Sequence, residues 1–120
     1  MPNSRIVLGG IDAAVRIGKA LDHPLRVRAL AALTQGELCV CELIELFGLA
    51  PSTVSKHMSI IADAGLVMRR RDRKWIYYTL PAIPEGPIAH ALDLVGTLVA
   101  DDPLVLDDKS HLPAINCQKA

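Results

Sequence analysis

The feature that most limits how this sequence can fold is a pair of amphipathic segments separated by three residues. In the first segment, apolar residues recur at i, i+3, i+4 and i+7, the spacing of a helix with one buried face: Val40, Leu43, Ile44 and Phe47. Gly48 is expected to end this helix, Pro51 to begin the next one and Gly65 to end it. The buried stripe of the second helix consists of Val54, Met58 and Ile61. The pattern predicts two helices joined by a tight turn.

A β-hairpin is expected directly after this helix pair. Two runs of β-prone residues, 66–70 and 75–80, flank a charged tip at residues 71–74. The order helix, turn, helix, hairpin is that of a winged helix-turn-helix, whose second helix enters the DNA major groove. The sequence therefore predicts a mainly α fold with a small β-hairpin, in the arrangement of a DNA-binding domain.

Apolar periodicity and the positions of Pro and Gly predict three further helices. They are expected over residues 12–21, 25–33 and 87–100. Asp22 is the expected N-cap of the second of these helices, because its carboxylate can accept hydrogen bonds from the first helical turn.

The length of the chain, 120 residues, is enough for one domain with its own core. We expect residues 1–10 to form a flexible N-terminal arm. Residues 11–100 are expected to form the DNA-binding and dimerisation domain, and residues 101–120 a loose C-terminal tail that carries Cys117.

Charge is distributed unevenly along the chain, although the formal net charge is +0. Residues 51–80 carry six Lys and Arg against two Asp and Glu, whereas residues 81–120 carry two against six. A basic middle segment is typical of a surface that meets a polyanion such as double-stranded DNA. The alternative is that these charges only keep the surface solvated.

Candidate DNA-contacting residues lie on the second helix of the pair and on the hairpin. Five side chains of the helix face away from its buried stripe and can reach base edges or phosphates: Ser52, Thr53, Ser55, Lys56 and Ser59. His57 lies only about 60° from the stripe, so a packed boundary position fits it as well as a DNA contact does. The hairpin supplies a dense basic set for phosphate contacts: Arg69, Arg70, Arg71, Arg73 and Lys74.

The last predicted helix offers a surface for a second copy of the chain. A single helix-turn-helix makes few base contacts, so tight binding normally requires a two-fold symmetric pair. An apolar stripe on this helix is predicted to form the homodimer interface: Ile88, Leu92, Val95 and Val99. The alternative is that the stripe folds back onto its own chain.

Two cysteines one residue apart, Cys39 and Cys41, lie at the start of the first helix of the pair. In a regular helix their side chains diverge by about 200°, so binding one small ion is expected to loosen the first turn. That distortion would disturb the element that positions the DNA-reading helix, which makes the pair a candidate switch. Thiolates prefer soft ions, and the helix N-terminus and nearby cations are expected to lower the thiol pKa values.

Membrane insertion and enzymatic activity are not expected. No apolar run reaches the roughly 18 residues that a membrane-spanning helix needs, which favours a cytoplasmic protein. In that reducing compartment, three cysteines favour thiol chemistry or simple burial over a disulfide framework. No catalytic His or Asp can be placed near the cysteine pair, and C-x-C differs from the C-x-x-C redox motif.

Four segments together resemble the ArsR/SmtB family of metal- and metalloid-responsive bacterial repressors: residues 37–43, 55–58, 64–67 and 74–80. The cysteine box is similar to that of the arsenical-resistance repressors. The resemblance implies a homodimer that binds operator DNA without a cofactor and represses its own resistance operon. It also implies that the inducer is trivalent arsenic or antimony, which releases the DNA by binding to the cysteines.

The sequence departs from the best-known arsenic box at one position. There a third Cys follows three residues after the second, and here that position is Ile44. Cys117 is the remaining thiol, and we predict it as the third ligand beside Cys39 and Cys41; the alternative is an incidental cysteine. A zinc site on the last helix would need paired His and carboxylates, of which that helix has one of each.

Three other interpretations remain open. The cysteines could form a redox switch operated by peroxide or disulfide exchange. A site with two thiols could prefer methylated trivalent arsenic, which needs fewer protein ligands. The winged helix could also serve contacts with another protein, in which case binding to DNA would lack the steep salt dependence of phosphate contacts.

Overall fold

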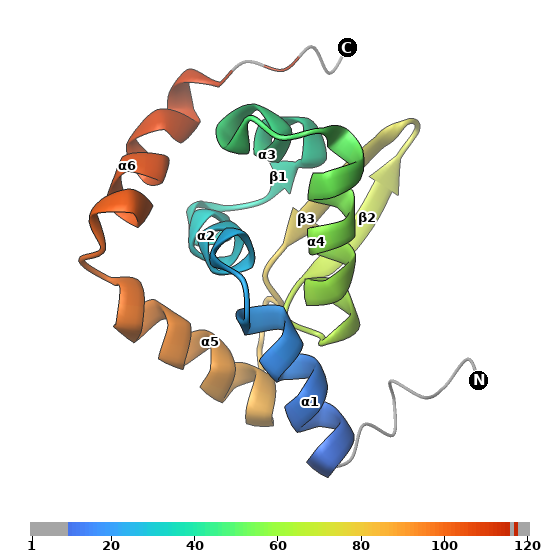
Figure 1. Ribbon diagram of the computed structural model, residues 1–120. Coiled ribbons are helices and arrows are strands. Elements are labelled where there is room, and N and C mark those ends of the chain that lie inside the picture. Colours follow the sequence, from blue (N-terminus) through green and yellow to red (C-terminus); the bar gives the residue numbers. More distant parts are fainter. Residues whose placement is uncertain (1–9, 116, 118–120) are drawn as a thin grey trace.

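The computed structural model describes residues 10–115 and residue 117. A small sheet lies at one side of a body of helices, and its hairpin, residues 68–79, projects outward as the wing (Figure 1). In chain order the elements are α1 Gly10–Leu21, α2 Pro24–Ala32, η2 Leu33–Gln35, β1 Leu38–Cys39, α3 Val40–Phe47, α4 Pro51–Asp63, β2 Met68–Asp72, β3 Trp75–Thr79, α5 Gly86–Val99, α6 Pro103–His111 and η3 Leu112–Ala114. The predicted fold class, mainly α with a small β-hairpin, is confirmed.

The core lies between α2, α3, α4 and the sheet. The predicted stripe of α4 is fully buried, because Val54, Met58 and Ile61 are each 0% exposed. Leu43 of α3 is also fully buried, and Ile44 and Phe47 pack against the core at its edge. These contacts hold α3 and α4 as one unit, since removing such side chains from water supplies most of the stabilising free energy.

The sheet has three strands in the order β1-β3-β2, and both pairings are antiparallel. The hairpin β2–β3 was predicted, whereas β1 was not, because two residues leave no periodic signal. In β1, Leu38 lies opposite Tyr78 and Cys39 opposite Tyr77. The cysteine segment is therefore part of the same sheet as the wing.

The predicted loose tail is wrong for residues 103–111, which form helix α6. The Asp102 carboxylate caps this helix by accepting hydrogen bonds from the N–H groups of Leu104 at 2.9 Å and Val105 at 3.3 Å. Val105 and Leu112 are buried, and burial of such a side chain stabilises a fold by roughly 1.5 to 3 kcal/mol. The consecutive apolar residues 104–106 lack helical spacing, so periodicity alone could not reveal α6.

The N-terminal part of the chain differs from the prediction at the start of α2. The N-cap of α2 is His23, whose Nδ1 accepts a hydrogen bond from the N–H of Leu25 at 3.0 Å; the prediction of Asp22 was wrong. Asp22 instead pairs with Arg26 on the next turn. The predicted flexible arm, residues 1–10, lies outside the described residues except for Gly10, which begins α1.

The apolar stripe predicted as a dimer interface packs onto the core of its own chain. Val95 is buried, and the other three members, Ile88, Leu92 and Val99, lie partly buried against the core. This packing agrees with the alternative given above, that the stripe folds back onto its own chain, where α5 lies against α2. The exposed large apolar side chains of α5 are Leu94 and Leu98, at 53% and 71%.

Among the described residues, no helix is both long and apolar enough to cross a membrane.

Candidate DNA-binding face and thiol cluster

Helix α4 presents an open polar face. All five predicted contact residues on this helix are exposed: Ser52, Thr53, Ser55, Lys56 and Ser59. The N-cap of α4 is Ala50, and no side chain in the described part of the chain caps this helix. Pro51 has no N–H, and the N–H groups of Thr53 and Val54 donate to the Ala50 oxygen at 3.0 and 3.1 Å, so in the described first turn the N–H of Ser52 is the one left for a phosphate oxygen.

His57 occupies a packed boundary position, which is one of the two positions predicted for it; the other was a DNA contact. Its Nδ1 lies 2.8 Å from Nη1 of Arg26, and its ring centroid lies 4.4 Å from that of His23. A guanidinium can only donate, so Nδ1 must accept this hydrogen bond. Burial lowers the pKa of His57, and the charges of His23, Arg26 and Lys56 lower it further.

Arg26 is a structural residue that sequence reasoning missed. Its guanidinium is buried and donates to the backbone oxygen of Lys19 from Nη2 at 2.8 Å and from Nε at 3.1 Å. Through these contacts it joins the end of α1 to His57 on α4. The sequence gives no signal for this role, because a charged residue in an ordinary helix is usually exposed.

The predicted basic residues of the wing are all exposed: Arg69, Arg70, Arg71, Arg73 and Lys74. Nε of Arg71 donates to the backbone oxygen of Arg73 at 2.8 Å, and Nζ of Lys74 lies 5.2 Å from the centroid of the Trp75 ring. Arg70 forms a two-pronged ion pair with Glu37, with both N–O distances 2.7 Å, and its guanidinium lies 4.3 Å from the centroid of the Tyr77 ring. Arg70 therefore ties the wing to the segment before the cysteines.

The structure brings the three predicted thiols together. Cys39 is the N-cap of α3 and is 0% exposed, whereas Cys41, in the first turn, and Cys117 are half-buried. The thiols of Cys117 and Cys39 lie close enough to that of Cys41 to raise its pKa. Within residues 10–115 and 117, no three His, Cys, Asp or Glu side chains already form a metal-ligating group. The cluster is thus a set of contacting thiols that needs local adjustment to surround one atom.

Two expectations about the cysteine pair were wrong. Because Cys39 precedes the helix, with φ −75° and ψ 148°, its side chain does not diverge from that of Cys41 as in a regular helix. The Glu42 carboxylate accepts a hydrogen bond from the Cys39 N–H at 2.8 Å, which completes a capping box. Burial raises the pKa of Cys41, as do its hydrogen bonds to Cys117 and Cys39, so the expected lowering fails for this thiol.

The chain is similar to known bacterial regulators over most of its described length. Residues 23–69 match the family model described as "Bacterial regulatory protein, arsR family". A probable mercury resistance operon repressor of Streptomyces lividans is 31% identical over 102 residues, which cover 85% of this chain and 79% of that protein. An arsenic resistance transcriptional regulator of Pseudomonas putida is 39% identical over 69 residues. That match covers 56% of this chain and 54% of the relative, so the chain spans about half of that regulator's length.

A solved structure shows the same architecture. The homodimeric winged helix-turn-helix DNA-binding domain of a possible ArsR-family regulator from Mycobacterium bovis superposes with a TM-score of 0.62 at 28% identity. The superposition covers 78% of this chain and 83% of that one. With helix pair, wing and sequence matches in agreement, the chain belongs to the arsR family of bacterial regulatory proteins, a family of transcriptional regulators and not of enzymes.

Proposed function

We propose that this protein is a transcriptional repressor that binds operator DNA as a homodimer and is released by trivalent arsenic or antimony. The inducer would be held by Cys39, Cys41 and Cys117. The observation that carries the proposal is that the thiols of Cys117 and Cys39 are near enough to Cys41 to raise its pKa. The names of the Pseudomonas relative and of an arsenical resistance operon repressor from Escherichia coli, 32% identical over 72 residues, support the same inducer.

The chemistry of capture requires no oxidant and no thiolate prepared in advance. Arsenous acid carries three hydroxyl groups on trivalent arsenic. Each of three thiols forms a sulfur–arsenic bond and gives its proton to a departing hydroxyl, so three waters leave and arsenic stays trivalent. The raised pKa of Cys41 is compatible with this exchange, because the proton leaves within the water. Sulfur ligands favour such soft centres over Mg²⁺ or Ca²⁺.

Two physical connections could carry capture to the DNA face. Cys39 ends β1, which pairs with β3 of the wing at Tyr77. Cys41 lies in α3, which packs against α4. Gathering three sulfurs around one atom would shift β1 and the first turn of α3, and that shift would reach both DNA-contacting elements. Release requires only that the inducer bind the shifted state more tightly than the DNA-bound state.

On DNA, the exposed face of α4 would enter the major groove and the wing would flank it. Ser52, Thr53, Ser55, Lys56 and Ser59 would supply contacts to bases and phosphates. Arg69, Arg71, Arg73 and Lys74 would contact phosphates, and Arg70 would hold the wing in position. His57, on the packed side of α4, would help to hold this helix in place through its hydrogen bond with Arg26.

For the homodimer we propose a surface other than the one predicted from the sequence. Helices α1 and α5 both pack against α2, and each leaves large apolar side chains exposed: Ile11 and Val15 on α1, Leu94 and Leu98 on α5. Monomeric proteins rarely leave large contiguous apolar surface exposed. The homodimeric Mycobacterium bovis relative supports this assembly.

A mobility-shift assay with operator DNA tests the proposal. We expect arsenite to release the wild-type protein, with steep salt dependence of binding in its absence. Retention of the complex at arsenite concentrations that occupy the free thiols would refute it. Because contacting thiols can also form a disulfide, a parallel titration with peroxide is needed; release by peroxide alone, reversed by dithiothreitol, would identify a redox switch instead.

A further inference from the structure

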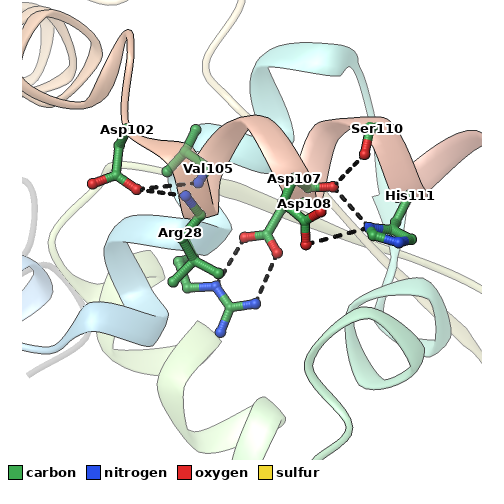
Figure 2. A network of polar contacts seen from close by, with 8 residues as sticks. Arg28, Asp102, Val105, Asp107, Asp108, Ser110 and His111 are labelled. Atoms are coloured by element: carbon green, nitrogen blue, oxygen red, sulfur yellow. Dashed lines mark hydrogen bonds and ion pairs between the residues drawn. The ribbon is translucent and has the colours of Figure 1, made fainter.

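The C-terminal helix is fastened to the body of the domain by a buried ion pair. Arg28 of α2 donates to Asp108 of α6 from Nε to Oδ2 and from Nη2 to Oδ1, each at 2.8 Å (Figure 2). The Asp108 side chain is 5% exposed and that of Arg28 22%. Two parallel hydrogen bonds between a guanidinium and a carboxylate fix both distance and orientation. The position of α6 on α2 is therefore specified closely.

The same guanidinium also touches the helix that begins with the thiols. The Arg28 Cζ atom lies 4.9 Å from the centroid of the Phe47 ring, and Phe47 is the last residue of α3. Cys39 and Cys41 lie at the other end of α3. Arg28 thus contacts α3 on one side and α6 on the other.

The segment after α6 leads to the third thiol. Turn η3 follows directly and its residue Leu112 is buried. Cys117 comes soon after, near enough to Cys41 of the same chain to raise the pKa of that thiol. The position of Cys117 consequently depends on where α6 is fastened.

We infer that α6 and η3 form an intrachain strap, and that Arg28 and Asp108 are positioning residues that hold Cys117 at the site as its third sulfur. The inference rests on the proposed function and extends it to specificity. A centre that takes three sulfurs, such as arsenite, requires the strap. Methylarsenite carries two hydroxyl groups and exchanges them for two sulfurs with loss of two waters, so Cys39 and Cys41 suffice for it.

The test compares Asp108→Asn with Asp107→Asn in the full chain. Asp107 is the matched control, because it lies beside Asp108 on α6 but is exposed, and its carboxylate pairs with His111 at 3.5 Å, whereas the two hydrogen bonds of Arg28 go to Asp108. Operator release is titrated with arsenite and with methylarsenite, and X-ray absorption counts the sulfurs around arsenic. Arg28→Lys is the second variant, since a lysine keeps the charge but cannot form the two-pronged pair. Operator affinity without inducer shows that each variant is folded.

For Asp108→Asn and Arg28→Lys we expect half-release to need about tenfold more arsenite, because the fraction of molecules with Cys117 in place falls. The sulfur count should fall from three to two, and the methylarsenite titration should stay within about twofold of wild type. Asp107→Asn should match wild type with both arsenicals. If Asp108→Asn does not bind the operator, the strap is judged from the arsenite response and the sulfur count of Arg28→Lys.

Three sulfurs and a wild-type arsenite response in the deciding variant would overturn the strap and leave the proposed function intact. An equal loss of response to both arsenicals would also overturn it, because that result indicates general disruption of the site. If the wild type is released by neither arsenical, the proposed function itself fails and the strap fails with it.

Discussion

The DNA face of α4 and the thiol cluster are built in opposite ways. The polar side chains of α4 are exposed and belong to one helix, above a stripe that is fully buried. The thiols are buried or half-buried and come from the start of α3 and from the segment after α6. A face made by one helix depends on that helix alone, whereas the cluster depends on contacts between distant segments. Substitutions should therefore be able to disable either region while leaving the other intact.

The strongest way to separate the two regions is Cys41→Ser. Cys41 contacts both other thiols, so its loss removes the centre of the proposed site. We expect the arsenite concentration for half-release to rise about 100-fold or more, because an atom bound by three sulfurs is held much less tightly when one of them is removed. Operator affinity without arsenite should stay within about twofold of wild type in the same mobility-shift assay, since hydroxyl and thiol are close in size. A variant still released at the wild-type arsenite concentration would exclude Cys41 as a ligand.

Lys56→Ala is the reciprocal test on the DNA face. Lys56 is exposed on α4, away from the buried stripe. Removing its charge should weaken operator binding about tenfold and reduce the slope of log affinity against log salt by about 0.9 per lost phosphate contact. Binding of arsenite to the free protein, followed by absorbance of the sulfur–arsenic bonds, should not change. Loss of both functions would mean that the two regions are not separable.

Glu37→Gln changes the contact between the wing and the segment before the cysteines. It removes the carboxylate that holds Arg70, which frees the wing from the segment before the cysteines. We expect operator affinity to fall about two- to fivefold, because exposed ion pairs contribute little. Arg70→Gln and the double variant should give about the same loss, since both break one contact. A much larger loss for Arg70→Gln than for Glu37→Gln would show that Arg70 contacts phosphate directly.

The smallest effect is expected at His57, as a pH dependence of the free energy of unfolding. Its folded-state pKa lies below the ordinary value of 6.5, so the unfolded chain binds the proton more readily. The groups facing it, His23, Arg26 and Lys56, oppose its protonation as well. The His57 contribution to the free energy of unfolding should therefore be present above about pH 6.5 and be lost as the pH falls below it. Urea unfolding at pH 7.5 and 5 should show a smaller loss for His57→Gln than for wild type.

His90→Gln is the control for this pH dependence, because His90 is exposed on α5. Its unfolding curves should follow those of wild type at both pH values. An unchanged pH dependence in His57→Gln would mean that another group is responsible.

The helix pair could be predicted because its signals lie within short windows. The stripe of Val54, Met58 and Ile61 and the turn that begins at Gly48 follow from spacing and backbone preference, and the structure confirms the buried stripe. Strand β1 and helix α6 were missed for different reasons. The first is too short to show alternation, and the second is stabilised by the Asp102 cap and by the Asp108 contact with Arg28, far away in the sequence.

The thiol site was predicted only in part. The pair Cys39 and Cys41 was evident from its spacing, and Cys117 followed because it was the one thiol left. That Cys41 meets both, and that its pKa is raised, depends on burial and on neighbours from another segment. How far its own chain covers the α5 stripe could not be predicted either, since exposure is a property of the packed chain.

By itself, the sequence determined the helix pair, the wing and the chemical character of the candidate residues, because these depend on side-chain type and on neighbours within a turn or two. Which charges form ion pairs, which apolar side chains are exposed and which thiols lie close together follows from the packing of the whole chain. Those outcomes depend on contacts between residues far apart in the chain, such as Arg28 with Asp108 and Glu37 with Arg70. Such contacts form only when the chain has packed and buried groups must find partners.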